Sequence, residues 1–203
     1  MLMDIKVLLV AGPPASGKDT ITEALTALDS KYVLFKKHRT GVDSAKYNTL
    51  SAGDFEQMKN DGAFVQAHYR YGRGYGVCKE TLRDLVDANK LPIIHTGKID
   101  NLLLLKSTIN YPCGTVLLWE ERDVLIERIK QRGPVNEVHT RVDGLDDELQ
   151  EWQDRYDDYM NLDLVIRNNS IENTCEKIVD LGKTKGRSEE FYNYVKSLEL
   201  PYL

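Results

Sequence analysis

A glycine-rich loop directly after a short apolar run is the feature that most constrains how this chain can fold. The run covers Ile5–Val10, and the loop Gly12-Pro-Pro-Ala-Ser-Gly-Lys-Asp-Thr20 follows it. The loop matches the pattern G-x-x-x-x-G-K, and Lys18–Leu28 carries apolar residues at helical spacing. In such a strand–loop–helix unit, backbone N–H groups and the positive end of the helix dipole attract phosphate oxygens. The sequence therefore predicts an ATP-binding loop at the end of a buried strand.

The residues of this loop are the expected nucleotide-binding residues. They are Gly12, Pro13, Pro14, Ala15, Ser16, Gly17, Lys18, Asp19 and Thr20. We expect Lys18 to reach the β- and γ-phosphates and to stabilise the transferring group in catalysis. The alternative is a glycine-rich turn in an α/β protein that binds no nucleotide.

One position of the loop departs from the usual motif. Asp19 stands where Ser or Thr normally binds Mg²⁺, and Thr20 follows it. A carboxylate beside a triphosphate is repelled unless a cation lies between them, so Asp19 and Thr20 are the expected Mg²⁺ residues, directly or through water. The alternative is that Asp19 only stabilises the first helical turn as an acid.

Strand-like and helix-like runs alternate along the chain. The predicted strands are Ile5–Val10, Tyr32–Phe35, Leu91–His95, Thr115–Glu120 and Leu162–Arg167, and the predicted helices are Lys18–Leu28, Glu80–Asn89, Asp100–Ile109, Glu121–Arg132, Arg141–Met160 and Ile171–Leu181. This alternation predicts an α/β fold in which helices flank a parallel sheet and ligands bind at the carboxyl ends of the strands.

The predicted domain organisation is one kinase domain over residues 1–187, with a core formed by 1–35 and 79–181. Residues 36–78 interrupt the alternation and are expected to form a small inserted subdomain, and Gly133–Thr140 a short polar segment between helices that carry arginines. Residues 188–203 form a predicted C-terminal helical tail, whose role the sequence leaves open.

Several motifs, in their order over roughly Val7–Leu181, resemble the guanylate kinase family. The matching pieces are Gly12-Pro13 with Gly17-Lys18, Tyr47 with Leu50-Ser51, Phe55–Met58, Phe64-Val65-Gln66, Gly72–Val77, Arg128–Gly133 with Arg141, and Asp163–Asn168. The resemblance implies a P-loop kinase fold in which residues 36–78 form an acceptor-binding insert and residues 132–141 form an arginine-bearing lid. It also implies an ATP-dependent phosphotransferase that uses Mg²⁺ and acts on a small phosphorylated acceptor.

Position by position, the resemblance implies roles for further residues. Arg39, Tyr47 and Tyr75 would hold the acceptor phosphate; Arg128, Arg132 and Arg141 would close over ATP and the transferring group; Asn168 would lie near the adenine. Bidentate arginines suit this task, because phosphoryl transfer needs alignment and positive charge. The alternatives are a solvated basic helix face for the lid arginines, a basic loop for Arg39, and packing of the insert for the tyrosines.

The acceptor pocket departs from the family where the base is recognised. Gln66 replaces the glutamate that accepts from guanine, Val77 replaces a hydroxyl residue, and His95-Thr96-Gly97 replaces Asp-x-Asp. Some features instead resemble ribose 1,5-bisphosphate phosphokinase, and Lys98 is a candidate to reach an acceptor phosphate. His95 is expected to be structural rather than catalytic. A nucleoside monophosphate is therefore the first candidate acceptor and a pentose phosphate the second, while a non-catalytic binding module is the remaining alternative.

The charge and composition of the chain indicate which partners and which cellular location to expect. A net charge of −5 over 203 residues argues against sequence-independent binding of nucleic acid. No apolar run approaches the ~18 residues of a membrane helix, and three scattered cysteines lack metal-ligand spacing. We expect a cytoplasmic protein, monomeric or homodimeric, without nucleic-acid or membrane partners.

Overall fold

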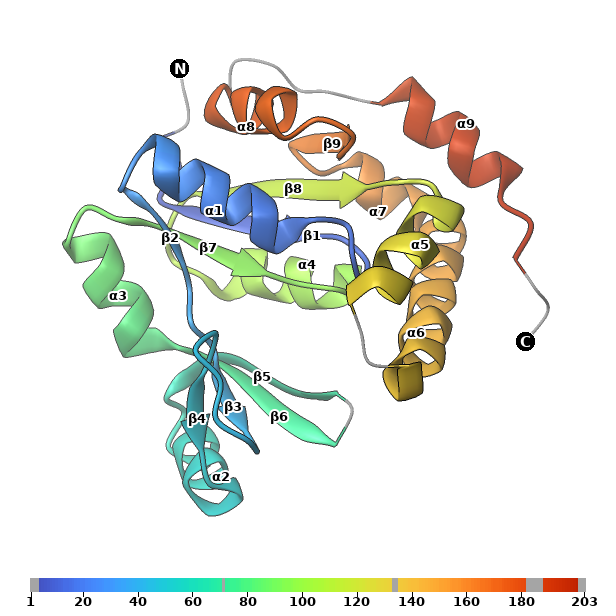
Figure 1. Cartoon of the computed structure of the whole chain (residues 1–203). Helices are drawn as coiled ribbons and strands as arrows, with labels where there is room; N and C mark the ends of the chain where they lie inside the picture. The colour runs from blue at the N-terminus through green and yellow to red at the C-terminus, as the bar shows by residue number, and fades with distance from the viewer. Residues whose placement is uncertain (1–3, 71, 133–134, 182–187, 201–203) are drawn as a thin grey trace.

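A parallel sheet lies at the centre of the structure (Figure 1). The computed structural model describes residues 4–70, 72–132, 135–181 and 188–200. The sheet has five strands in the order β2-β7-β1-β8-β9. They are β1 (Val7–Ala11), β2 (Tyr32–Leu34), β7 (Leu91–His95), β8 (Cys113–Trp119) and β9 (Leu164–Arg167). All neighbouring pairs are parallel, so the predicted α/β fold is confirmed.

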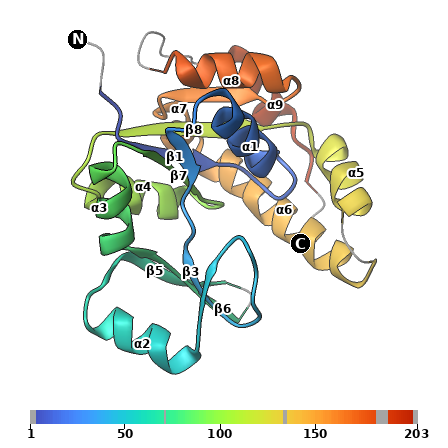
Figure 2. The same cartoon turned by 60° about the vertical axis from the view of Figure 1, so that its left-hand side comes forward.

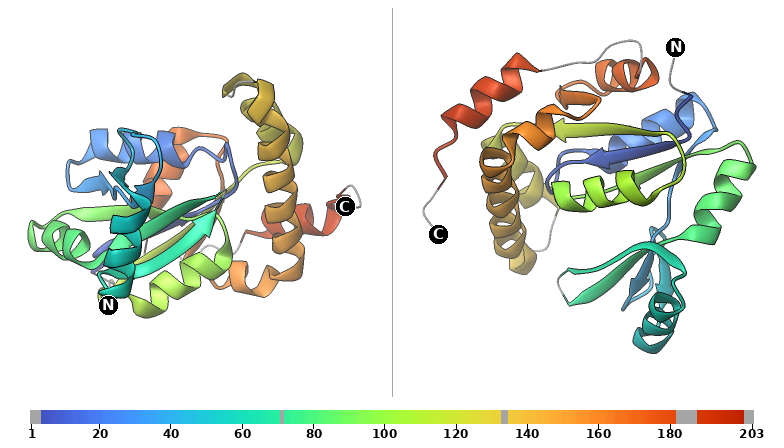
Figure 3. Two further views of the ribbon diagram at one scale, coloured as in Figure 1. Left: turned by 90° about the horizontal axis from the view of Figure 1, so that it is seen from below. Right: turned by 180° about the vertical axis from the view of Figure 1, so that it is seen from behind.

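The two faces of this sheet are covered by different helices. Because successive side chains of a strand point to opposite faces, Leu9 of β1 packs in one buried cluster and Leu8 in the other. One face is covered by α1 (Lys18–Leu28) and α8 (Ile171–Val179). The other is covered by α3 (Lys79–Asp87), α4 (Ile99–Thr108), α5 (Arg122–Arg132), α6 (Val135–Asp154), α7 (Tyr156–Met160) and α9 (Glu189–Ser197) (Figure 3). None of the helices in the described part of the chain is long and apolar enough to cross a membrane.

The insert forms a second small sheet beside the first (Figure 2). Its strands lie in the order β4-β3-β6-β5. They are β3 (His38–Thr40), β4 (Asn48–Leu50), β5 (Phe64–Arg70) and β6 (Arg73–Cys78), and α2 (Ala52–Asn60) packs on them through the buried Phe55. In the chain, the insert follows the carboxyl end of the edge strand β2 and is followed by α3.

Two helical segments differ from the sequence prediction. The stretch predicted as a polar segment up to Thr140 is helical from Val135 onward, and the helix predicted to run unbroken to Met160 stops at Asp154 and restarts at Tyr156. Arg155 at the break bonds Asp100 and Asp158 through its guanidinium. Residues 133 and 134 of the predicted lid lie outside the described residues.

Candidate active site

The phosphate loop connects β1 to α1. Gly17 precedes α1 with a φ of 92°, a conformation that favours glycine, and Ile21 N–H donates to its carbonyl at 2.9 Å. A Cβ at Gly17 would also collide with the Asn168 amide. That amide donates from Nδ2 to the Ser16 carbonyl at 2.7 Å. Asn168 thus holds the loop from the end of β9.

Lys18 folds back over its own loop. Its Nζ donates to the carbonyl of Gly12 at 2.5 Å, to the carbonyl of Pro13 at 2.9 Å and to Ser16 Oγ at 3.4 Å. Burial lowers the pKa of Lys18 to about 8, against the opposing effect of nearby carboxylates. The loop oxygens hold the ammonium at a position where phosphate oxygens would replace them.

Asp19 lies in the first turn of α1 and is engaged by the insert. Lys46 Nζ lies 2.5 Å from Asp19 Oδ2, and His95 Nδ1 lies 3.5 Å from Asp19 Oδ1. Burial opposes the charge of Asp19, but the hydrogen bond and the charge of Lys46 outweigh it and keep the pKa of Asp19 below its usual value. Burial and the charge of Lys18 lower the pKa of His95 to about 3, so His95 is neutral. It bonds Thr22 Oγ1 through Nε2 at 2.7 Å.

The donor set at Asp19 suits Mg²⁺ only together with a nucleotide. Among the residues that the structure describes, no three His, Cys, Asp or Glu side chains are grouped to hold a metal by themselves. Mg²⁺ commonly takes one or two carboxylates plus substrate phosphates and water. Asp19 provides one such carboxylate, and Thr20 lies outside the lining of the cleft described below.

The three residues expected to hold the acceptor phosphate lie together in the insert. The Arg39 guanidinium stacks over the Tyr47 ring at 4.3 Å and donates from Nη2 to the Val42 carbonyl at 2.5 Å. Tyr47 meets Tyr75 edge to face at 5.8 Å. His68 of β5 stacks on Tyr75 at 5.6 Å. Both tyrosines line the cleft, whereas Arg39 is buried behind them.

Two residues expected in the acceptor pocket are held inside the protein. Gln66 is buried, and its Nε2 donates to the carbonyl and the Oδ1 of Asn101 at 3.1 and 2.9 Å. Val77 is 1% exposed and packs in the main hydrophobic cluster. Lys98 is exposed just before α4 and does not line the cleft.

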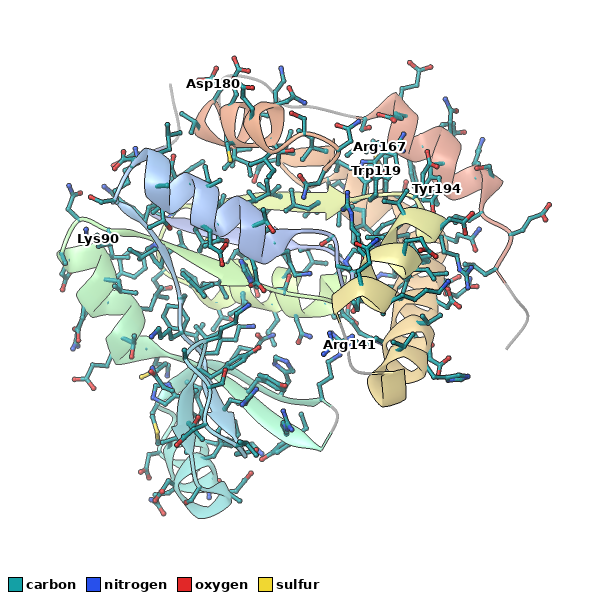
Figure 4. All side chains as sticks on the ribbon, in the orientation of Figure 1. Lys90, Trp119, Arg141, Arg167, Asp180 and Tyr194 are labelled. Carbon is teal, nitrogen blue, oxygen red and sulfur yellow. The ribbon has the colours of Figure 1, made fainter. Side chains whose placement is uncertain are left out.

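Arg128 lies on the other side of the phosphate loop. Its guanidinium donates to the carbonyls of Ala15 at 3.5 Å and Asn168 at 3.4 Å, and lies 3.5 Å from the buried Glu120. Arg141 of α6 lines the cleft on the side that faces the insert (Figure 4). The side chain of Arg132 lies outside the described residues.

A cleft of about 560 Å³ joins the phosphate loop, the insert and α6. Gly12, Pro14, Lys18, Asp19, Tyr47, Tyr75 and Arg141 are the predicted residues that line it. Sequence reasoning missed Lys37, Lys46, His68, Arg70, Arg73, Asn101 and Glu148, which also line it, and it gave His95 no binding role. Apart from Arg73, which lies within the Gly72–Val77 motif, these residues belong to no motif. For several of them, the only sequence signal of a binding role was the high content of basic residues in the insert.

Comparison with known proteins places these features in a family. The guanylate kinase family model matches residues 4–184. Guanylate kinase from Helicobacter pylori (strain ATCC 700392 / 26695) is 25% identical, covering 95% of this chain and 94% of that protein. Guanylate kinase from Gluconobacter oxydans (strain 621H) is 24% identical, covering 77% and 79%. The crystal structure of guanylate kinase from Anaplasma phagocytophilum shares the fold, with a TM-score of 0.64 and 18% identity over 97% of each chain. The chain therefore belongs to the guanylate kinase family.

Proposed function

We propose that this protein transfers the γ-phosphoryl group of ATP to a small phosphorylated acceptor, with a nucleoside monophosphate as the first candidate. An acceptor oxygen attacks the γ-phosphorus, the bond to the β-phosphate bridging oxygen breaks, and ADP leaves. The observation that carries the proposal is the shared cleft, in which Lys18 of an intact phosphate loop faces Tyr47 and Tyr75 of the insert.

The residues around the cleft suit each part of this transfer. The loop Gly12–Thr20 would bind the ATP phosphates, and Lys18 would move from the loop carbonyls onto the transferring group. Arg128 and Arg141 would supply charge to the same group from α5 and α6. Asp19 would hold Mg²⁺, which neutralises the β- and γ-phosphate oxygens when bound. Arg39, Tyr47 and Tyr75 would hold the acceptor phosphate.

A phosphorylated pentose is the second candidate acceptor. This candidate is supported by the lack of suitable hydrogen-bonding groups at Gln66 and Val77. A guanine-binding pocket needs side-chain hydrogen-bonding groups that face the base. The Gln66 amide N–H groups are used by Asn101, and Val77 has no hydrogen-bonding group and packs in the core. A non-catalytic binding module fits less well, since the glycines and Lys18 of the phosphate loop are all present.

A coupled assay of ADP release over nucleoside monophosphates and phosphorylated pentoses tests this proposal. We expect acceptor-dependent release by the wild-type protein and a loss of about 10²-fold or more in Lys18→Ala. Lys177→Ala, which changes an exposed lysine of α8, is the matched control and should retain full activity. The proposal would be contradicted if ADP were released without an acceptor, or if the folded Lys18→Ala variant still released ADP.

A further inference from the structure

A buried glutamate and an arginine meet beside the cleft, at a point where three parts of the fold come together. Arg70 is the last residue of β5, and Glu148 lies in α6. Arg70 Nη2 lies 2.6 Å from Glu148 Oε1, and the Glu148 side chain is only 2% exposed. Gly97 follows β7 and leaves room for the pair, because a Cβ there would lie 2.5 Å from Arg70 Nη1 and 2.9 Å from Glu148 Oε1. The ion pair thus joins the insert, α6 and the central sheet.

Positive charge dominates this part of the cleft. Burial and the charges of Lys18 and Arg70 lower the pKa of Lys37 to about 8. Burial and the charges of Lys37 and Arg70 lower the pKa of His68 to about 4, so His68 is neutral. The ATP phosphates would meet Lys18, which leaves Lys37 and Arg70 with one carboxylate, Glu148. The other acid that lines the cleft in the described part of the chain is already paired with a lysine of the insert. A bound anion would supply the missing negative charge.

Arg70 shares one face of β5 with two polar residues that, within the described ranges of the chain, each have one buried atom without a hydrogen-bond partner. Gln66, His68 and Arg70 alternate along the strand and so point to the same side. Gln66 Oε1 and His68 Nδ1 are buried and have no hydrogen-bond partner among the residues that the structure describes. Buried polar atoms normally have a partner. Of these two residues, His68 lines the cleft, so a ligand hydroxyl would satisfy its Nδ1. Two residues of strand span roughly 6.6 Å, which separates Arg70 from the His68–Tyr75 stack.

We propose that Arg70 is a specificity-determining residue of the acceptor site and binds a second anionic group of the acceptor. This inference rests on the proposed kinase function and narrows the acceptor class to a sugar or nucleoside phosphate that carries another phosphate or a carboxylate. The first phosphate lies at Arg39, Tyr47 and Tyr75, the polar middle of the acceptor lies at His68, and the second anion lies at Arg70.

Glu148 acts on the acceptor through Arg70 and is a positioning residue. A guanidinium has five N–H donors on several edges, so one arginine binds a carboxylate and a phosphate together. The carboxylate of Glu148 accepts from the guanidinium and so fixes the orientation of the guanidinium plane. Lysine at position 70 would keep the positive charge but would lose the planar arrangement of N–H donors that a guanidinium offers.

Pairs of acceptors that differ by one anionic group test the inference. Suitable pairs are a nucleoside 5′-monophosphate with its 3′,5′-bisphosphate, and a pentose 5-phosphate with its 1,5-bisphosphate. A 5-phosphorylated aldonic acid tests a carboxylate in place of the second phosphate. Binding is measured by calorimetry, and KM and kcat by ADP release. In the wild-type protein we expect at least one doubly anionic member to bind about tenfold more tightly than its partner.

Variants separate recognition from folding. Arg70→Met with Glu148→Gln avoids leaving a buried charge unpaired, and should reduce the preference for the doubly anionic acceptor to about twofold or less while the singly anionic one binds as before. Glu148→Gln retains an acceptor for Arg70 and should keep most of the preference, whereas Glu148→Leu should lose it. Arg83→Met changes an exposed arginine of α3 and should leave the preference unchanged.

The outcomes distinguish this inference from the proposed function. If the wild-type protein binds both members of every pair equally, the inference is wrong even where ADP is released. An Arg70 variant that weakens both members equally would assign Arg70 a structural role and overturn it as well. If no acceptor supports ADP release but the preference in binding and its loss in the Arg70 variant hold, the kinase proposal fails and the second anion site stands.

Discussion

At the scale of single residues, Lys18 is the cation on which the proposed function depends. It is a buried ammonium surrounded by loop oxygens, and burial brings its pKa down to about 8. Its protonated form is the one that attracts phosphate, so the charge is present below pH 8 and is lost as the pH rises through that value.

The first prediction follows from that titration. In the wild-type protein, the affinity for a non-hydrolysable ATP analogue should fall about tenfold between pH 7 and 9.5, because the free site loses a cation. In Lys18→Ala, affinity should be low at both pH values and most of the fall should disappear. Fluorescence titration across this range provides the measurement. An equally steep fall in the variant would assign the titration to another group.

The second prediction concerns Asp19, whose carboxylate holds Lys46 at 2.5 Å. Asp19→Asn should raise the Mg²⁺ concentration for half-maximal activity by about fivefold or more, because a neutral amide is a poorer ligand for a hard cation. Glu23→Gln removes an exposed acid from the same helix and is the control. An unchanged Mg²⁺ titration in Asp19→Asn would reduce this residue to a stabiliser of the first helical turn.

At the scale of elements, the sequence predicted best where a local signal fixed both ends of a segment. The predicted bounds of α1 and β7 are those of the structure, because a glycine precedes the helix and a compact apolar run defines the strand. The start of α6 was missed, since Gly133-Pro134 resembled a loop although proline is also favoured at a helix start. At the break, Arg155 bonds Asp100, which is 55 residues away, and no local pattern reveals that contact.

The helix α9 is the element whose role the sequence left open. Phe191 is fully buried, and its ring lies 5.5 Å from Trp119 of β8 and 5.2 Å from Trp152 of α6. Tyr194 stacks on the Trp119 ring at 5.2 Å (Figure 4). Although α9 comes after the last strand and after α8 in the chain, it completes the hydrophobic core on one face of the sheet.

The third prediction tests that contribution. Phe191→Ala should lower the free energy of unfolding by about 3–5 kcal/mol, the usual cost of removing a buried phenylalanine. Asn193→Ala changes an exposed residue of the same helix and should cost less than about 0.5 kcal/mol. Urea denaturation measures both. A small effect of Phe191→Ala would mean that α9 is an appendage after all.

At the scale of the whole molecule, the cleft is assembled from parts that are far apart in the chain. The phosphate loop was predictable because its chemistry lies within nine consecutive residues, Gly12 to Thr20. Glu148 meets Arg70 across 78 positions and Gln66 meets Asn101 across 35, so neither contact has a sequence signature. The family resemblance predicted Tyr47 and Tyr75, which line the cleft, but it gave no information on residues outside its motifs, such as Arg70 and Glu148.

The last prediction depends on this assembly. GMP should be a poor acceptor for the wild-type protein, since Gln66 has no carboxylate for the guanine edge and its amide is bound to Asn101. Gln66→Glu should not raise kcat/KM for GMP above that for AMP, because a carboxylate at this buried position would lose the two hydrogen bonds to Asn101 and would face the Asn101 oxygens. Val77→Thr should not help, because its hydroxyl would be buried among apolar side chains and would cost ~1–3 kcal/mol of stability. Steady-state kinetics with both nucleotides and a denaturation curve for each variant are the measurements. Efficient wild-type turnover of GMP, near ~10⁶ M⁻¹s⁻¹, would show instead that the cleft recognises guanine through other groups.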